Sequence, residues 1–559
     1  MNEISRRQRS AERERAEVER FATIFERCRV NVLLVADAFL CFSDEEFGLS
    51  ELVSIMQASP LHVRFAITSA HRGDPGAMRL NGATANFVFT DAALQGVDEL
   101  WLFAADSSGS LPEAEVLAIT KFMQAGGGVF ATGGHGNLGA TLCGEIPRVR
   151  SMRKWHSSAS GDQPHATAPD DSNDPQTERK RGRRNTAPPF DELQDAVPHP
   201  ISPKFYTRKL TPRLVEKYPH PVLCGPHGAI RVLPVHPHEC ECIVPIALDR
   251  TLDIGHSREA RSLDEYPMNA AGLRVSPDVI ATSTMTTPGD ATATQRGAAG
   301  TVGVYDGHRA SIGRVVVDAT WHQFINRNLT GGLAGYDAQK RVGLLHANAG
   351  DAGATERARL KRDCDQIRGY FHNIGTWLAP LTSQRYMTQW TLRYVAKSNP
   401  LFDEIANIDS EKLLLHEYVR LGATAYQRLR TFVRPCGALK LAIDVLPPFR
   451  EQLPWPSDPW APNAAPDVDP RVFALDPVTI ELANLGAIVV EMHRVDGKVQ
   501  KRADEDALAR AVECGQQRSA EVLMTAVREL AAALSHVVKS TRADVEISSC
   551  NQVASKNGL

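Results

Sequence analysis

The 559-residue sequence lacks the features that mark several large classes of protein. Nowhere do about 18 consecutive apolar residues occur, the length that a membrane-spanning helix requires. Opposite charges nearly cancel, with 63 Lys and Arg against 66 Asp and Glu, so no extensive basic surface for nucleic acid or anionic lipid is expected. These absences predict a soluble protein that does not bind membranes, with nucleic acid an unlikely partner.

Cysteine is scarce and scattered, with ten residues and no CxxC pair. Cys240 and Cys242 share a face if the chain there is extended, which permits metal binding, although buried small side chains are the simpler interpretation. The charged start of the chain lacks the apolar core of a signal peptide. We therefore expect reduced thiols, no disulfide framework and a cytoplasmic location.

The most distinctive stretch is Gly126 to Gly139, GGGVFATGGHGNLG. A Gly-rich turn precedes a short apolar run, and a second Gly-rich turn carries His135. A buried parallel strand that ends at a ligand-binding crevice has this pattern.

Apolar runs of strand length alternate with helical patterns along the first 330 residues. The expected strands are 31–36, 63–68, 100–104, 129–132, 301–305 and 314–317, and the expected helices among them are 44–56 and 111–125. This alternation predicts an α/β fold with a doubly wound, mostly parallel, flavodoxin-like sheet, whose ligands bind beyond the carboxyl ends of the strands.

Shifts in composition divide the chain into five expected parts. They are a charged helix (1–29), an α/β domain (30–335) with a flexible insertion (157–200), a helical domain (350–446), a Pro-rich linker (447–477) and a C-terminal helical segment (478–559). The insertion is polar and cannot bury enough surface to order itself. Its basic run, Lys180 to Arg184, is compatible with phosphate or nucleic-acid contact but is more simply a solvated loop.

The helical part should contain helices at 355–377, 383–396, 410–430, 436–445 and 504–539. The apolar run 487–492 is either an isolated strand or the end of another helix. These helices offer a surface for a protein partner or for self-association.

Several of these motifs, in this order, resemble the class I glutamine-amidotransferase-like fold, within it the trehalose-utilisation-protein-like branch. They are Gly126-Gly127-Gly128, His135, His220-Pro221, Glu239 and Gly313-Arg314-Val315 leading to His322. The family resemblance implies a nucleophilic Cys at the turn after the fourth strand, but Thr132-Gly133-Gly134-His135 stands there. Cys143 follows too late for that position, so a thiol-dependent glutaminase is not expected.

Imidazole and carboxylate groups near predicted strand ends form the candidate site. His135, His322 and Glu239 are the expected catalytic groups, since such side chains transfer protons near neutral pH. His236 and His238, two residues apart, are candidate ligands for a divalent metal such as Zn. Candidate ligand-binding residues are Arg148, Arg150, Arg153, Trp155, His220 and Asp318. For each of these residues an ordinary structural role is the alternative.

Two hypotheses about function follow. In the first, the crevice binds a small polar or carbohydrate-like ligand and acts as a hydrolase, with or without a metal. In the second, the domain has lost catalysis and serves as a sensing or scaffolding module whose helices assemble with a partner.

Overall fold

In a computed structural model, the described residues are 26–58, 62–134, 138–153, 199–209, 215–235, 241–252, 263–270, 272–284, 298–330, 354–398, 412–446, 459–460, 477–496 and 505–556. They form two compact units. Unit 1 comprises Met1–Tyr206, Lys217–Trp390 and Arg434–Cys436, and unit 2 comprises Thr207–Glu216, Thr391–Val433 and Gly437–Leu559. The expected insertion lies outside the described residues up to residue 198, as does the expected charged helix up to residue 25.

Unit 1 contains an eight-stranded sheet in the order β2-β1-β3-β4-β14-β13-β12-β6. The strands along that order are Val63–His71, Cys28–Ala36, Glu99–Phe103, Gly128–Ala131, Val315–Asp318, Ala298–Tyr305, Asp278–Thr284 and Ser202–Pro203. The five strands from β2 to β14 are parallel, and the pairs from β14 to β6 are antiparallel. The α/β prediction is confirmed at this level, with one correction: the strand expected at 301–305 runs antiparallel as β13.

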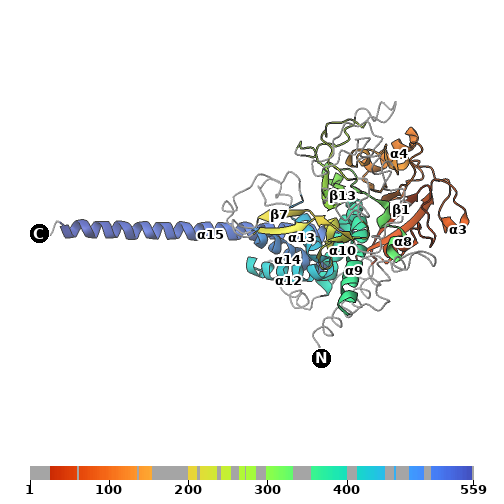
Figure 1. Cartoon of the computed structure of the whole chain (residues 1–559). Coiled ribbons are helices and arrows are strands. Elements are labelled where there is room, and N and C mark those ends of the chain that lie inside the picture. Colours follow the sequence, from red (N-terminus) through yellow and green to blue (C-terminus); the bar gives the residue numbers. More distant parts are fainter. Residues whose placement is uncertain are drawn as a thin grey trace. The chain divides into compact units, whose positions relative to one another are not determined.

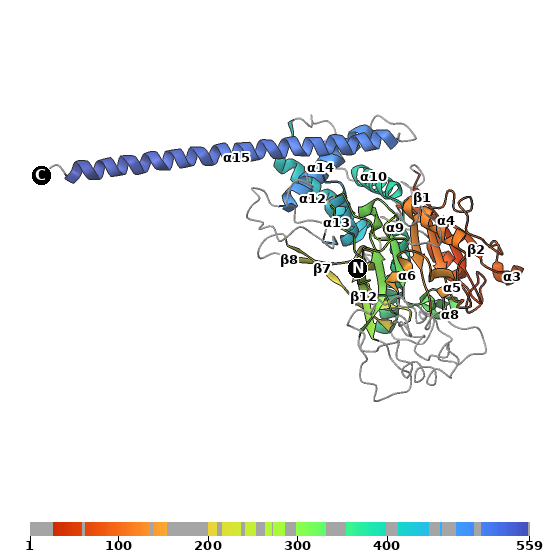
Figure 2. The same ribbon diagram turned by 90° about the horizontal axis from the view of Figure 1, so that it is seen from above.

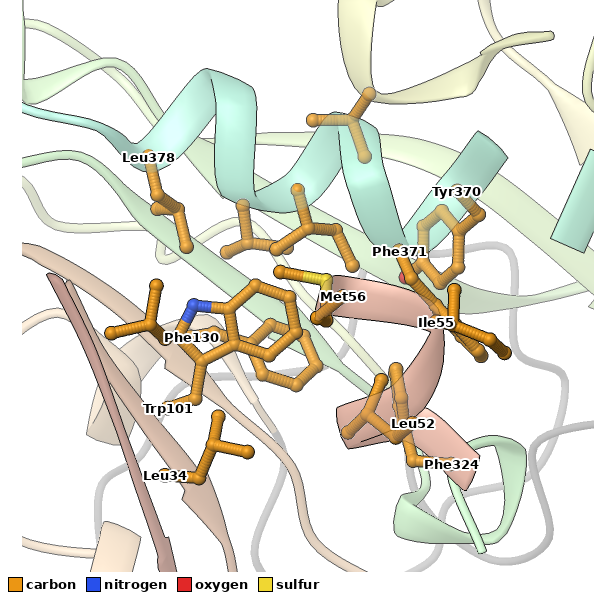
Figure 3. Close-up of a cluster of buried hydrophobic side chains, with 14 of the residues drawn as sticks. Leu34, Leu52, Ile55, Met56, Trp101, Phe130, Phe324, Tyr370, Phe371 and Leu378 are labelled. Atoms are coloured by element: carbon orange, nitrogen blue, oxygen red, sulfur yellow. The ribbon is translucent and has the colours of Figure 1, made fainter. Parts of the chain in front are cut away.

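Helices cover both faces of this sheet. Side chains from α2 (Ser50–Gln57) and α9 (Ala354–Leu378) belong to one apolar core, whereas those from α4 (Glu113–Gln124), α5 (Ala140–Cys143) and α6 (Val149–Met152) belong to the other. Figure 3 shows the first core, in which Trp101 and Phe130 of the sheet lie near Met56 of α2.

Alternating side chains assign each strand to the two cores. In β1, Leu34 joins the α2 and α9 core whereas Leu33 and Val35 join the α4 core. Strands buried on both faces read as continuous apolar runs, which is why they were visible in the sequence.

Helix α9 belongs to unit 1, so the expected helical domain 350–446 is divided between the two units. Its Tyr370, Phe371 and Leu378 are buried in the same core as Trp101. The position of α9 is set by its packing against the sheet, and the helical periodicity of the sequence does not specify that packing.

The helix expected at 44–56 begins only at Ser50. Asn326 holds the preceding residues in a turn, because its amide group donates to the carbonyl oxygens of Ser43 and Glu45 at 3.0 and 2.9 Å and its oxygen accepts from the amide of Glu51 at 3.0 Å. A residue 275 positions from Glu51 therefore holds the start of α2.

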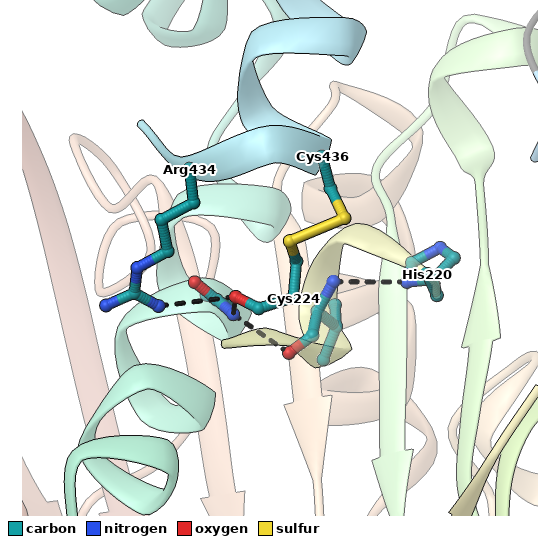
Figure 4. Close-up of a disulfide and its surroundings, with 6 residues drawn as sticks. His220, Cys224, Arg434 and Cys436 are labelled. Carbon is teal, nitrogen blue, oxygen red and sulfur yellow. Dashed lines mark hydrogen bonds between the residues drawn. A yellow bond between two sulfur atoms is a disulfide. The ribbon is translucent and has the colours of Figure 1, made fainter. Parts of the chain in front are cut away.

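Cys224 and Cys436 form a disulfide, with Cα atoms 6.1 Å apart (Figure 4). The expectation of reduced thiols is wrong for this pair, because the fold brings together two cysteines 212 residues apart. Arg434 donates to the carbonyl oxygen of Cys224 at 3.2 Å beside it. The free cysteines among the described residues are Cys28, Cys41, Cys143, Cys242, Cys364 and Cys514.

Unit 2 is built mainly from helices α12 (Leu415–Phe432), α14 (Pro477–Asp496) and α15 (Glu505–Lys556), with most of α13 (Arg434–Asp444). The run 487–492 lies inside α14, so of its two expected structures the helix is correct. Glycines allow close packing here, since a Cβ on Gly422 would lie 1.8 Å from the carbonyl oxygen of Leu482. Figures 1 and 2 show that α15 extends beyond α12 and α14.

Shorter elements complete the described chain: α3 (Ala77–Leu80), β5 (His199–Pro200), β7 (Phe205–Lys209), β8 (Val215–Pro219), η2 (Pro221–Leu223), β9 (Cys224–Gly225), β10 (Gly228–Ala229), β11 (Val232–Leu233), η4 (Gly307–Ala310), η5 (Trp321–Gln323), α8 (Asn326–Thr330) and α10 (Leu381–Lys397). Among the helices of the described residues, none combines the length and apolar character needed to cross a bilayer.

Candidate functional site

The carboxyl ends of the parallel strands lie along one edge of the sheet in unit 1. Asp37 follows β1, Ala105 and Asp106 follow β3, Gly133 and Gly134 follow β4, and Asp318 ends β14. Ligands of open α/β sheets bind at this edge, so its polar groups are the candidates for function.

Protein side chains fill the Gly-rich turn after β4. A Cβ on Gly133 would lie 1.2 Å from Nη1 of Arg153, and one on Gly134 would lie 2.5 Å from Nε1 of Trp321. Arg153, 1% exposed, donates through Nη2 to the carbonyl oxygens of Gly134 at 2.9 Å and Ala319 at 3.1 Å. These two glycines therefore make room for the guanidinium and the indole of the protein itself.

Asp318 is a buried carboxyl whose oxygens are both occupied. It accepts hydrogen bonds from the Tyr370 hydroxyl at 2.6 Å, from Nε2 of Gln323 at 3.0 Å and from the amide of Thr320 at 3.1 Å. Burial raises its pKa to about 7, although these donors oppose the shift. Thr320, not Asp318, caps η5, because its hydroxyl accepts from the amide of His322 at 3.1 Å.

Asp37 is also a buried carboxyl, but only one of its two oxygens has hydrogen-bond partners among the described residues. Its Oδ1 accepts from the amides of Ala105 at 2.6 Å and Asp106 at 3.1 Å. Its Oδ2 is buried and has no hydrogen-bond partner among the described residues. Burial raises the pKa of Asp37 to about 7, and the charge of Asp106 adds to that effect. A buried polar atom without a partner is costly, so this oxygen marks a place where a ligand or water donor would be stabilised.

Glu99 also has a buried oxygen, Oε1, without a partner among the described residues. It lies at the amino end of β3, and Nε1 of Trp101 donates to its other oxygen at 2.8 Å. Burial raises the pKa of Glu99 well above the ordinary value. Its position at the opposite edge of the sheet separates it from the candidate site.

Two of the histidines expected in the site, His220 and His322, lie among the described residues and are packed into the fold. The His322 ring lies against Trp321, with centroids 3.9 Å apart, and is 1% exposed. His220 caps η2 by accepting from the amide of Val222 at 3.3 Å, and its ring lies 5.1 Å from that of Trp377. Each therefore has a packing role in unit 1.

Arg148 and Arg150 converge on Glu265. Arg148 donates through its amide to Oε1 of Glu265 at 2.6 Å and through Nε to the Glu265 carbonyl oxygen at 2.8 Å. Arg150 donates through Nη2 to Oε2 at 2.8 Å. The Arg148 guanidinium lies over the Tyr305 ring at 5.7 Å, and burial lowers its pKa. These arginines hold the segment around Glu265 in place, and a role in ligand binding remains a prediction.

Five candidate residues lie outside the described residues: His135, Trp155, His236, His238 and Glu239. The catalytic roles of His135 and Glu239 and the metal-binding roles of His236 and His238 therefore remain predictions. Within the described ranges, no group of three or more His, Cys, Asp or Glu side chains is placed to hold a metal ion.

Of the three thiols considered in the sequence, Cys143 and Cys242 are buried, and Cys240 lies outside the described residues. Burial raises the pKa of Cys143 far above its ordinary value, and the charge of Asp37 adds to the effect. The Cys242 thiol donates to the carbonyl oxygens of Thr301 and Val317, both at 3.4 Å. Both thiols are therefore protonated at neutral pH, which disfavours a thiolate nucleophile or metal ligand.

Unit 2 contains a cavity of about 230 Å³ among β7, β8, α12, α13 and α14. Its lining includes Arg208, which is paired with Glu481 and lies 4.0 Å from Glu216. The protein thus neutralises this cation itself, and Tyr426 and Gln427 are the other polar side chains of the lining.

Asp37 was not among the residues singled out from the sequence. It directly follows the apolar run 31–36, so a polar residue after a buried strand was the available signal.

Comparisons with family models, curated proteins and solved structures found no match for this chain.

Proposed function

We propose that unit 1 is an amidotransferase-like α/β domain that binds a small polar, carbohydrate-like ligand at the carboxyl ends of β1 and β3, with Asp37 as the recognising carboxyl. The order of its parallel strands, β2-β1-β3-β4-β14, supports the flavodoxin-like part of this proposal. In that arrangement the chain reverses direction across the sheet between β1 and β3, and ligands bind at such a switch point.

The buried Oδ2 of Asp37, which has no hydrogen-bond partner among the described residues, carries the proposal. Asp37 directly follows β1 and accepts hydrogen bonds from the amides that follow β3, so it lies between the two strands of the switch point. Next to it, the segment from Asp106 to Ser110 is largely exposed and rich in hydroxyl groups. A ligand hydroxyl would complete the hydrogen bonding of Oδ2.

The pKa of about 7 allows Asp37 two modes of recognition. Near neutral pH its protonated form can donate a hydrogen bond and its ionised form can accept one. Sugar hydroxyls both donate and accept hydrogen bonds, so they can pair with either form. Hydrolysis would also need a nucleophile or base beside this carboxyl. The Cys143 thiol, whose pKa the charge of Asp37 raises further, does not serve as one. Asp37 has the properties needed to bind a hydroxyl, whereas Cys143 does not supply the second group that hydrolysis needs. The proposal therefore favours binding over hydrolysis.

Ligand-observed NMR with glucose, trehalose and glutamine tests the proposal on wild type, Asp37→Asn and Asp318→Asn. Asp318 is the matched control, because it is as buried, has a similar pKa and lies at the same edge, but its oxygens are occupied. We expect a sugar to bind wild type and Asp318→Asn, and the binding to weaken at least about tenfold in Asp37→Asn, equivalent to one lost charge-assisted hydrogen bond.

Binding of neither sugar would contradict the ligand class. Equal sugar binding by wild type and Asp37→Asn would contradict the site, and equal weakening by Asp318→Asn would show that the effect reflects the fold of the edge.

A further inference from the structure

The last part of α15 presents apolar side chains to solvent. Met524, Leu530, Leu534 and Val538 are 53, 43, 57 and 53% exposed. Single exposed apolar residues need no explanation, but a row of them along one helix marks a contact surface.

The apolar residues in this part of α15 include a set with the spacing of a coiled coil. Leu523, Val527, Leu530, Leu534 and Val537 are alternately four and three residues apart, which is the heptad pattern with an average of 3.5. We call Val527, Leu530, Leu534 and Val537, with the flanking Met524 and Val538, the α15 stripe.

The α15 stripe continues an interface already formed inside unit 2. Leu508, Ala511 and Leu523 of α15 are buried, and a Cβ on Gly515 would lie 2.4 Å from the Cα of Ile488 in α14. Helix α14 begins at Pro477, eleven residues before Ile488. Because α15 runs antiparallel to it, Pro477 lies opposite about residue 526 of α15. Helix α15 thus continues beyond the start of α14 (Figure 2). The face of α15 that is buried against α14 then carries the exposed apolar residues of the stripe.

About 30 residues of helix follow that point, a length of roughly 45 Å at 1.5 Å per residue. Packing of an apolar face supplies most of the stability of helices in proteins. A partner on the stripe would provide such packing for residues 524–538.

We propose that the α15 stripe pairs with the stripe of a second copy of this chain. A helix with the same heptad period can pack along the stripe, and α15 of a second copy is such a helix. The positions beside the seam are Ala526, Ala531, Ala533 and Val538, where coiled coils that select a different partner carry charges. Identical helices therefore meet without like-charge repulsion, and the small alanines allow close approach. This inference does not depend on the ligand site of unit 1.

Sedimentation equilibrium of the full chain tests the pairing against the monomer mass of 61.2 kDa. We expect wild type to sediment at a multiple of this mass at micromolar concentration. The double variant Leu530→Asp/Leu534→Asp should weaken association at least 100-fold, because two charges per helix would enter the seam. The control Thr525→Asp/Ala532→Asp places the same charges on the opposite face and should keep the wild-type mass.

Cysteine cross-linking tests the contact directly, in a background with Cys514→Ser and Cys550→Ser. Leu534→Cys should form a disulfide between two copies under mild oxidation, whereas Ala532→Cys should not. A monomeric wild type would overturn the proposal. So would a multimer that survives the Leu530→Asp/Leu534→Asp change, or a stripe that captures a different protein while the chain stays monomeric.

Discussion

Two stretches at the same edge of one sheet differ in how their polar groups are matched. At the turn after β4, Arg153 and Trp321 occupy the space that two glycines leave open, and beside it Tyr370, Gln323 and Thr320 bond to Asp318. At the ends of β1 and β3, Asp37 keeps one buried oxygen without a partner among the described residues. Burial raises the pKa of both aspartates to about 7. A shifted pKa therefore does not distinguish a structural carboxyl from a candidate site, whereas the hydrogen-bond partners do.

The largest expected effect is at the turn after β4. Gly133→Ala should destabilise unit 1 by about 3 kcal/mol or more, because the new Cβ would displace a buried guanidinium from its two carbonyl partners. Hydrogen–deuterium exchange of the β1 and β3 amides reports this loss for unit 1 separately. Gly109→Ala, where the Cβ meets nothing within 4 Å, is the control and should change stability by less than about 0.5 kcal/mol. A Gly133→Ala protein as stable as the control would show that Arg153 does not hold this turn.

The next effect tests whether Asp318 is structural. Tyr370→Phe should cost about 1–3 kcal/mol, since it leaves a buried carboxyl oxygen without its donor. The same exchange measurement applies, combined with Asp318→Asn in a double-mutant cycle. Additive losses in the two single variants would mean that this hydrogen bond contributes nothing to stability.

The pH dependence should sharpen the comparison of the two aspartates. Their folded-state pKa values, about 7, exceed the ordinary 3.8, so the folded state binds protons that the unfolded state has released. The stability of unit 1 should therefore fall as pH rises from about 4 to about 7, by at most about 1.4 kcal/mol per pH unit for each group.

Asp37→Asn and Asp318→Asn should each remove one such contribution, as judged from exchange rates corrected for intrinsic pH effects. A saturating ligand should change only the contribution of Asp37. An unchanged slope in Asp37→Asn would contradict the raised pKa on which the proposed recognition depends.

The smallest expected effect concerns Cys143. Replacing it with Ala should leave any release of ammonia from glutamine unchanged, because burial keeps this thiol protonated and out of solvent. A coupled ammonia assay checks this outcome. Glutaminase activity that disappears in Cys143→Ala would restore the thiol mechanism of the amidotransferases.

The sequence by itself determined the elements that local pattern encodes. The apolar runs 31–36 and 100–104 are strands because residues buried on both faces leave a continuous signature. The run 63–68 forms the edge strand β2, in which exposed residues such as Arg64 interrupt the buried ones. The helices expected from 355 and 504 are present because their periodicity is long. The heptad spacing in α15 is equally a property of the sequence.

Only the tertiary structure decided which polar groups are matched. Gly133 and Gly134 suggested a ligand site in the sequence, yet their space belongs to Arg153 and Trp321. Asp37 was not predicted as a site residue, because its role depends on hydrogen bonds from two amides that follow another strand. The disulfide between Cys224 and Cys436 joins residues 212 positions apart. Such matches are set by distances between segments remote in the chain, and local composition does not record them.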